Sequence, residues 1–145
     1  MKLNLPLKTQ PEELENTTLY DVLLQQKQNL AAIGQRYTDI VWAAGLFEGE
    51  GCIHTLQMTK AKTTYRTLRQ AMTDKDVMER FVNVVGYGNL NGPIWNTKST
   101  KPVWDWNVTK KTEVLRILKM FLPHFGIRRA EKAIEAITFL NETTY

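Results

Sequence analysis

Residues 42–53 read WAAGLFEGEGCI, and this stretch decides the fold. Asp39 precedes it as a candidate helix N-cap, and Gly51 is a natural helix terminator. Glu48 and Glu50 therefore stand in the last turn of a predicted helix. The C-terminal end of a helix carries about half a negative charge from its dipole, so carboxylates are unfavourable there. These two acids need an explanation other than helix stability.

Small residues occupy one side of the same predicted helix. Gly45 and Gly49 are four positions apart and stack on one face, with Ala44 beside them. Glycine inside a helix costs about 1 kcal/mol relative to alanine. A close helix–helix contact would offset that cost, because small residues at this spacing let a second backbone approach.

Two such helices side by side would bring carboxylates together, and the like charges would repel. A divalent cation would relieve that repulsion, and hard oxygen ligands with open positions for water and phosphate suit Mg²⁺. An acid and a glycine alone favour a plainer interpretation, in which Glu50 points into solvent and Gly51 only ends the helix.

The composition limits the class of protein. A chain of 145 residues that is 43% hydrophobic is long enough for one domain with a core, and too short for two comfortable ones. The single cysteine, Cys52, rules out an intramolecular disulfide and suits a reducing compartment. No apolar run approaches the roughly 18 residues of a membrane span, and the first residues lack signal-peptide features. We expect a cytoplasmic location, or the interior of an organelle or nucleoid, and no secretion.

The net charge of +4 lies entirely after residue 37, because residues 1–37 carry four charges of each sign. The cations bunch at residues 98–101, 110–111, 116–119 and 128–132. Clustered cations suit a polyanion-binding surface, because each neutralised phosphate releases counterions. Each cluster fits equally well as a solvated helix face.

The hydrophobic periodicity predicts an N-terminal extension, residues 1–37, that is partly helical, and a single domain over residues 38–145. The extension should start as a polar segment, with a helix from Thr17 or Thr18 that weakens at Gly34. The domain should have the order α-β-β-α-β-β-α-α. Its predicted elements are a helix at 40–50, strands at 52–59 and 64–72, a helix at 75–85, strands at 88–96 and 103–109, and helices at 112–122 and 128–140.

The segment AAGLFEGEG, residues 43–51, resembles the LAGLIDADG motif of homing endonucleases. Three later segments resemble other blocks of that family in the same order: MTDKDVMERFVNVVGYGNL, WDWNVTKK and LPHFGIRRAEKAIEAITFL. The resemblance covers about residues 39–141. It implies an α+β fold with an αββαββα core, whose saddle-shaped antiparallel sheet lies in the DNA major groove.

The resemblance further implies a sequence-specific double-strand DNA endonuclease active in intron homing. A chain with one motif would act as a homodimer on a near-palindromic site, with Ala44, Gly45, Glu48 and Gly49 at the dimer interface. The divalent metal, Mg²⁺ or Mn²⁺, would be bound by Glu50 and a main-chain oxygen of Gly51. For Glu48, a cap or structural hydrogen bond near the dimer axis fits better than metal ligation.

Two departures from the family pattern concern catalysis. Many members carry a water-ordering glutamine where this chain has Met72, and Gln70 is the candidate substitute. A cation after the fourth strand usually stabilises phosphate charge, and Lys110 is the candidate here, with Lys111 next. Lys110 could instead simply begin a helix.

Polar residues of the predicted strands are the candidates for reading base edges. They are His54, Tyr65, Thr67, Arg69, Asn91, Asn96, Asp105 and Asn107. The first strand does not alternate cleanly, so Thr55 and Gln57 compete with His54. The candidates for phosphate contacts, which carry no sequence information, are Lys98, Lys101, Arg128, Arg129 and Lys132.

Three other functions remain open. A maturase of the same family would bind intron RNA, and a regulator of the same fold would bind DNA without cutting it. A soluble interaction module with a glycine-packed dimer helix requires the four ordered segments to be coincidental.

Overall fold

A computed structural model describes residues 18–58, 60, 63–98 and 100–143. The chain divides into two units, Met1–Asp39 and Ile40–Tyr145. The predicted polar segment 1–16 lies outside the described residues. Within the described ranges, no helix combines the length and the apolar character that crossing a membrane requires.

The first helix, α2, is one uninterrupted helix, Leu19–Glu50, of 32 residues. It begins with a capping box, in which the Thr18 amide donates to Asp21 Oδ2 at 3.3 Å and the Asp21 amide donates to Thr18 Oγ1 at 3.2 Å. The prediction of two helices, with an end near Gly34 and a new cap at Asp39, is wrong. Asp39 instead accepts a hydrogen bond from Gln35 Nε2 at 3.0 Å, an i,i+4 pair inside the helix.

The remaining elements confirm the predicted order. They are β1 (Gly51–Met58), β2 (Thr63–Met72), α3 (Lys75–Val85), β3 (Asn89–Ile94), β4 (Val103–Val108), α4 (Lys111–Phe121), the 3₁₀ turn η1 (Leu122–His124) and α5 (Ile127–Glu142). Pro123 does end α4, but the chain continues directly as the 3₁₀ turn.

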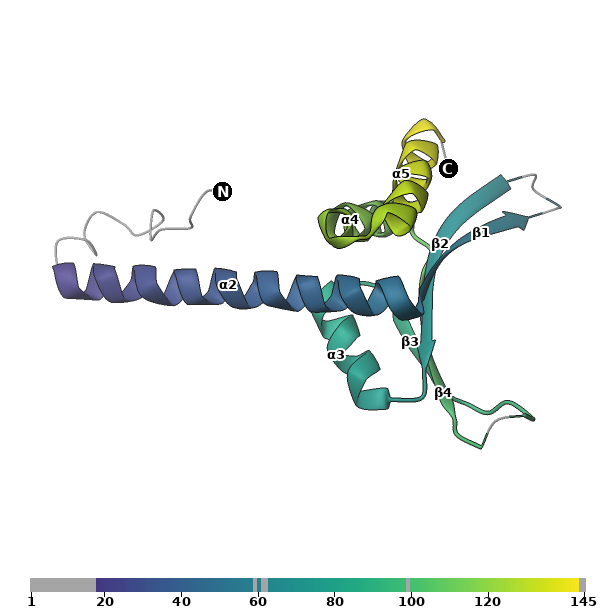
Figure 1. The fold of residues 1–145 in the computed structure, drawn as a ribbon, viewed down its shortest axis with the longest axis horizontal. Coiled ribbons are helices and arrows are strands. Elements are labelled where there is room, and N and C mark those ends of the chain that lie inside the picture. The colour runs from purple at the N-terminus through teal and green to yellow at the C-terminus, as the bar shows by residue number, and fades with distance from the viewer. Residues whose placement is uncertain (1–17, 59, 61–62, 99, 144–145) are drawn as a thin grey trace. The chain divides into compact units, whose positions relative to one another are not determined.

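The four strands form one antiparallel sheet in the order β1-β2-β4-β3. Strands β2 and β4 are therefore central, and β1 and β3 are the edges. Helices α3, α4 and α5 all lie on one side of this sheet, and strands β1 and β2 curve away from them (Figure 1). One face of the sheet is thus covered by helices, and no element of the described residues covers the other, which we call the open face.

Aromatic side chains fill the space between the sheet and the helices. Trp106 of β4 lies fully buried, and its indole N–H donates to the carbonyl of Tyr87 at 2.9 Å. Phe81 of α3 meets Trp106 edge to face, with ring centroids 4.9 Å apart. Phe47 of α2 and Phe121 of α4 join the cluster, with centroids 5.7 Å apart. The C-terminal part of α2 is therefore held in place by the core.

Candidate functional site

Helix α2 carries the motif segment and ends at the acidic residues that were predicted to form the site. Glu50 is the last residue of α2 and is exposed, and Gly51 is the first residue of β1. A Cβ at position 51 would lie 2.2 Å from Cδ2 of the Phe47 ring. Gly51 is therefore required by the ring beneath it. This close approach fixes the main chain directly after Glu50.

Glu48 is engaged within its own chain. Its Oε1 accepts a hydrogen bond from the amide of Gly126 at 2.6 Å, and its carbonyl accepts one from Nη2 of Arg129 at 2.9 Å. Gly126 is the N-cap residue of α5 and has no side-chain cap of its own. Glu48 therefore joins the end of α2 to the start of α5.

The glycine face of α2 is open, whereas Ala44 is not part of it. A Cβ added to Gly45 or Gly49 would meet no atom of the described residues within 4 Å. Ala44 is 0% exposed and belongs to the core, which contradicts its predicted place at a dimer interface. The reason is helical geometry, since Ala44 is about 100° around the helix from Gly45 and three residues from the buried Phe47.

The strand register assigns side chains to the two faces of the sheet. Pairs Ile53–Leu68 and Leu68–Val108 lie on the helix-covered face, and therefore Thr55 and Gln57 share that face. The open face receives the alternate residues. It carries seven of the predicted base-reading residues: His54, Tyr65, Thr67, Arg69, Asn91, Asp105 and Asn107.

Not all seven residues are equally available to a ligand. Nη2 of Arg69 lies 3.5 Å from Oδ2 of Asp105, across two central strands. Thr67 is only 4% exposed and offers little surface to a ligand. Asn96 lies beyond the end of β3, and its Oδ1 accepts a hydrogen bond from the Lys98 amide at 3.4 Å.

The structure contradicts the prediction that Gln70 orders water at the reaction centre. Gln70 is 1% exposed on the helix-covered face, opposite Trp106, and its Nε2 lies 3.5 Å from Sδ of Met78. Met72 is half-buried on the same face, opposite Trp104, and packs against the core. Both residues therefore point into the protein, away from the open face.

The predicted cations lie at several places around the domain. Lys110 is exposed and occupies the N-cap position of α4, whereas Nζ of Lys111 donates to the carbonyl of Thr143. Lys98 and Lys101 are exposed on the connection between β3 and β4. A hydrogen bond of 2.9 Å from Arg116 Nη1 to the Tyr87 hydroxyl raises the pKa of Arg116 further above its usual value.

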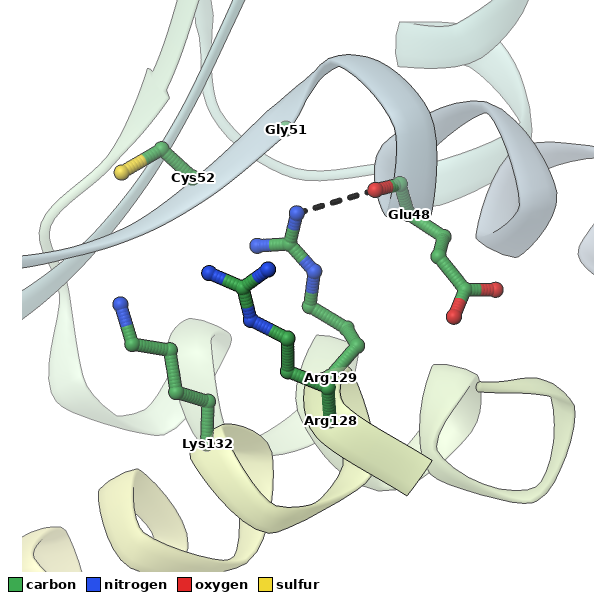
Figure 2. A pocket seen from close by; sticks show the side chains of 6 residues that line it. All are labelled: Glu48, Gly51, Cys52, Arg128, Arg129 and Lys132. Carbon is green, nitrogen blue, oxygen red and sulfur yellow. Dashed lines mark hydrogen bonds between the residues drawn. The ribbon is translucent and has the colours of Figure 1, made fainter. Parts of the chain in front are cut away.

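Three cations converge on the start of β1 (Figure 2). A pocket of about 380 Å³ is lined by Glu48, Gly51, Cys52, Arg128, Arg129 and Lys132. The sequence predicted Arg128, Arg129 and Lys132 as phosphate contacts, but no pattern in it indicated that they face the motif. Cys52 as a lining residue, and Phe47 as the support of Gly51, were both missed. The i,i+4 spacing of Phe47 and Gly51 was the available signal for the latter.

One chain supplies an incomplete set of metal ligands. No group of three His, Cys, Asp or Glu side chains able to hold a metal ion occurs among residues 18–143 as far as the structure describes them. Glu50 offers an exposed carboxylate, and the adjoining Gly51 offers a main-chain oxygen. Both are hard ligands of the kind that Mg²⁺ prefers, and Mg²⁺ usually completes its coordination with water and phosphate oxygens.

Comparisons with known proteins give the family and agree with the fold. A family model described as LAGLIDADG endonuclease matches residues 43–140. The fold is similar to that of the homing endonuclease I-CvuI in complex with a DNA target, with a TM-score of 0.62 and 16% identity over 74% of this chain and 69% of that one. It is also similar to I-TnaI (TM-score 0.55, 15% identity, 70% and 71% covered).

A third similar structure is the LAGLIDADG homing endonuclease I-SmaMI bound to cleaved DNA. It has a TM-score of 0.56 and 16% identity over 70% of this chain and 35% of that one. The aligned part of this chain therefore corresponds to about a third of the I-SmaMI chain. Among curated proteins, no sequence matches this chain.

Proposed function

Because this chain belongs to the LAGLIDADG endonuclease family, we propose that it is a sequence-specific DNA endonuclease that cuts both strands of a near-palindromic site as a homodimer. The observation that carries this proposal is the end of α2. There an exposed carboxylate, Glu50, directly follows a glycine face that no part of the described chain fills.

The glycine face supports the homodimer. Gly45 and Gly49 weaken the helix, and inside the protomer nothing described approaches either of them. A second copy of α2 packed on this face would offset that cost and place two copies of Glu50 near a twofold axis. A twofold protein presents the same reading surface twice, so its target would be two similar half-sites in opposite orientation.

The same arrangement supports the use of a metal. In the dimer the carboxylate of Glu50 and the main-chain oxygen of Gly51 would hold Mg²⁺ or Mn²⁺. A divalent ion there would activate water and stabilise the oxygen that leaves the phosphodiester. I-CvuI was crystallised with DNA targets in the presence of Mg or of Ca. Lys110, exposed at the start of α4, is the protein cation we assign to the charge of the phosphate.

The open face of the sheet is the proposed reading surface. Its arginine, histidine, asparagine and aspartate side chains offer donors and acceptors for base edges in the major groove. Arg69 is the clearest candidate for a guanine, because its guanidinium stays half exposed while Asp105 orients it. The exposed Lys98 and Lys101 would contact phosphates at one end of this surface.

The test is cleavage of a randomised duplex library by purified protein, with Mg²⁺ and with EDTA. We expect metal-dependent products that share one near-palindromic sequence. The Glu50→Gln variant should lose cleavage and keep its DNA affinity, since the change removes a charge and little volume. Glu142→Gln, an exposed acid at the end of α5, is the matched control and should cut normally. A Glu50→Gln variant that cuts at the wild-type rate would refute the metal assignment.

One observation favours a second candidate, a DNA-binding regulator without nuclease activity. The water-ordering glutamine of the family pattern has no counterpart here, because Gln70 is buried and Met72 packs against the core. A protein that binds one duplex sequence selectively, and cuts no DNA in Mg²⁺ or Mn²⁺, would support the regulator. Retention of intron RNA in place of duplex DNA would support a maturase.

A further inference from the structure

The pocket between α5 and β1 has an excess of positive charge. Three cationic side chains, Arg128, Arg129 and Lys132, rise from the first two turns of α5 toward β1 (Figure 2). The one acid that lines the pocket, Glu48, already accepts the Gly126 amide at 2.6 Å. Like charges this close repel one another, and an anion between them would remove the repulsion.

The position on α5 makes the excess more unusual. The N-terminal end of a helix carries a partial positive charge and favours acids in its first turn. Helix α5 has no acid in its first turn, which holds two arginines instead. Its cap comes from another element, through the carboxylate of Glu48. The helix dipole therefore adds to the positive potential of the pocket.

The three cations have different tasks. Nη2 of Arg129 donates to the Glu48 carbonyl at 2.9 Å, and its guanidinium lies 5.6 Å from the centre of the Phe47 ring. Arg128 and Lys132 are exposed, and neither has a hydrogen bond or an ion pair with the residues that the structure describes. Arg129 thus holds α5 against α2, and the other two are available to a ligand.

Helix α5 is fixed at a second point, so the pocket is formed in advance. Nη2 of Arg66, on β2, lies 2.6 Å from Oε1 of Glu135, and its guanidinium lies 4.0 Å from the centre of the Phe139 ring. With the Glu48 contact, α5 is held against both α2 and the sheet. The backbone that carries Arg128 and Lys132 is therefore held in place, and an anion has to order only the two side chains.

We propose that this pocket binds one backbone phosphate of the DNA duplex, with Arg128 and Lys132 as its ligands and Arg129 as a positioning residue. The inference rests on the proposed function. Cys52 shares the open face with Arg69 and Asn107, and β1 is an edge strand, so the pocket lies at the margin of the reading surface. A duplex read in its major groove places its phosphates at such a margin. Arginine and lysine are the side chains that bind phosphate groups best.

The test measures the affinity for a fluorescent duplex of arbitrary sequence in EDTA, over a series of KCl concentrations. The slope of log affinity against log salt becomes shallower by about 0.9 for each phosphate that the protein no longer neutralises. Each protomer of the proposed homodimer carries one such pocket. We therefore expect the Arg128→Ala/Lys132→Ala double variant to have a slope shallower by about 1.8, because the two side chains of each pocket share one phosphate. Arg128→Lys/Lys132→Arg should keep the wild-type slope.

Two further variants separate binding from structure. Lys119→Ala, an exposed cation on α4, is the matched control and should not change the slope. Arg129→Gln should lower the melting temperature and keep the slope, because Arg129 supports the pocket without binding the phosphate. An unchanged slope in the double variant, or a decrease of twice the expected size, would overturn the shared phosphate site.

The same measurements separate this inference from the proposed function. A protein that shows the slope difference but never cuts DNA keeps the phosphate pocket and loses the nuclease proposal. A wild-type protein that binds no duplex refutes both. If inorganic phosphate then raises the melting temperature of the wild type alone, and not of the double variant, the pocket serves a free oxyanion and the proposed DNA contact is wrong.

Discussion

Two glycines at the end of α2, Gly49 and Gly51, have opposite surroundings. An added Cβ would lie 2.2 Å from the Phe47 ring at position 51, and it would meet nothing within 4 Å at position 49. We expect Gly51→Ala to lower the free energy of unfolding by about 1–3 kcal/mol through overpacking. Gly49→Ala should raise it by up to about 1 kcal/mol through helix propensity. Urea unfolding of both variants, at concentrations where the protein is monomeric, measures the difference.

Glu48 illustrates a cap supplied by a distant residue. Glu48→Ala removes the acceptor for the Gly126 amide, and we expect stability to fall by about 1 kcal/mol, the usual effect of removing a helix cap. Glu48→Gln keeps an oxygen acceptor and should be destabilised less. Thermal unfolding measures the melting temperatures of the two variants. Equal destabilisation would show that the hydrogen bond is unimportant.

Single residues also mark the limit of the sequence-based predictions. Gln70 is polar and stands two residues before the expected catalytic position, so the sequence pattern suggested a role at the site. Its neighbours Leu68 and Met72 share its face of β2, and all three point toward the helices. Alternation along the strand contained this information, but the register that identifies the covered face came from pairing with β4.

At the scale of elements, short periodic segments were predictable and the long helix was not. Helix α3 has the predicted bounds, Lys75–Val85, because its apolar stripe is strong and Gly86 ends it with a φ of 79°. For α2, Gly34 and Asp39 resemble end signals. A lone glycine costs only about 1 kcal/mol, and i,i+4 side-chain pairs such as Gln35–Asp39 offset part of it, so the helix continues.

The open face of α2 gives a prediction about assembly. Gly45→Leu or Gly49→Leu would put a large side chain where a second helix must approach closely. We expect either variant to be monomeric, with half the wild-type mass by light scattering, and to keep its helix content. Lys119→Leu, which places the same side chain at an exposed site on α4, is the control and should not abolish the dimer. A wild-type mass in both leucine variants would rule out this face as the dimer interface.

At the scale of the whole domain, the sequence predicted which strand residues share the open face of the sheet better than it predicted which residues surround the end of α2. Polar residues on strands follow a simple alternation, and seven of the eight predicted base-reading residues share the open face. The pocket formed by Arg128, Lys132 and the start of β1 depends on how α5 crosses the sheet. Such a contact joins residues about 80 positions apart, and no local pattern encodes it.

The proposed difference between residues that contact bases and residues that contact phosphates gives the last prediction. Arg69→Ala should relax the preference for one base pair in each half-site, by about 1–3 kcal/mol of discrimination. Lys98→Ala should weaken binding about equally for all sequences, since a phosphate contact carries no base information. Selection of bound duplexes from a random library, followed by sequencing, distinguishes the two effects. An unchanged base preference in Arg69→Ala would remove this residue from the reading surface.

The close approach of Phe47 to Gly51 also constrains how this protein can evolve. The Phe47 ring lies under Gly51, and the guanidinium of Arg129 lies 5.6 Å from its centre, so one ring supports both the motif and the pocket. A lineage that acquires a side chain at position 51 must first accept a smaller residue at position 47. We therefore expect substitutions at these two positions to be coupled, although Phe47 is fully buried in the core.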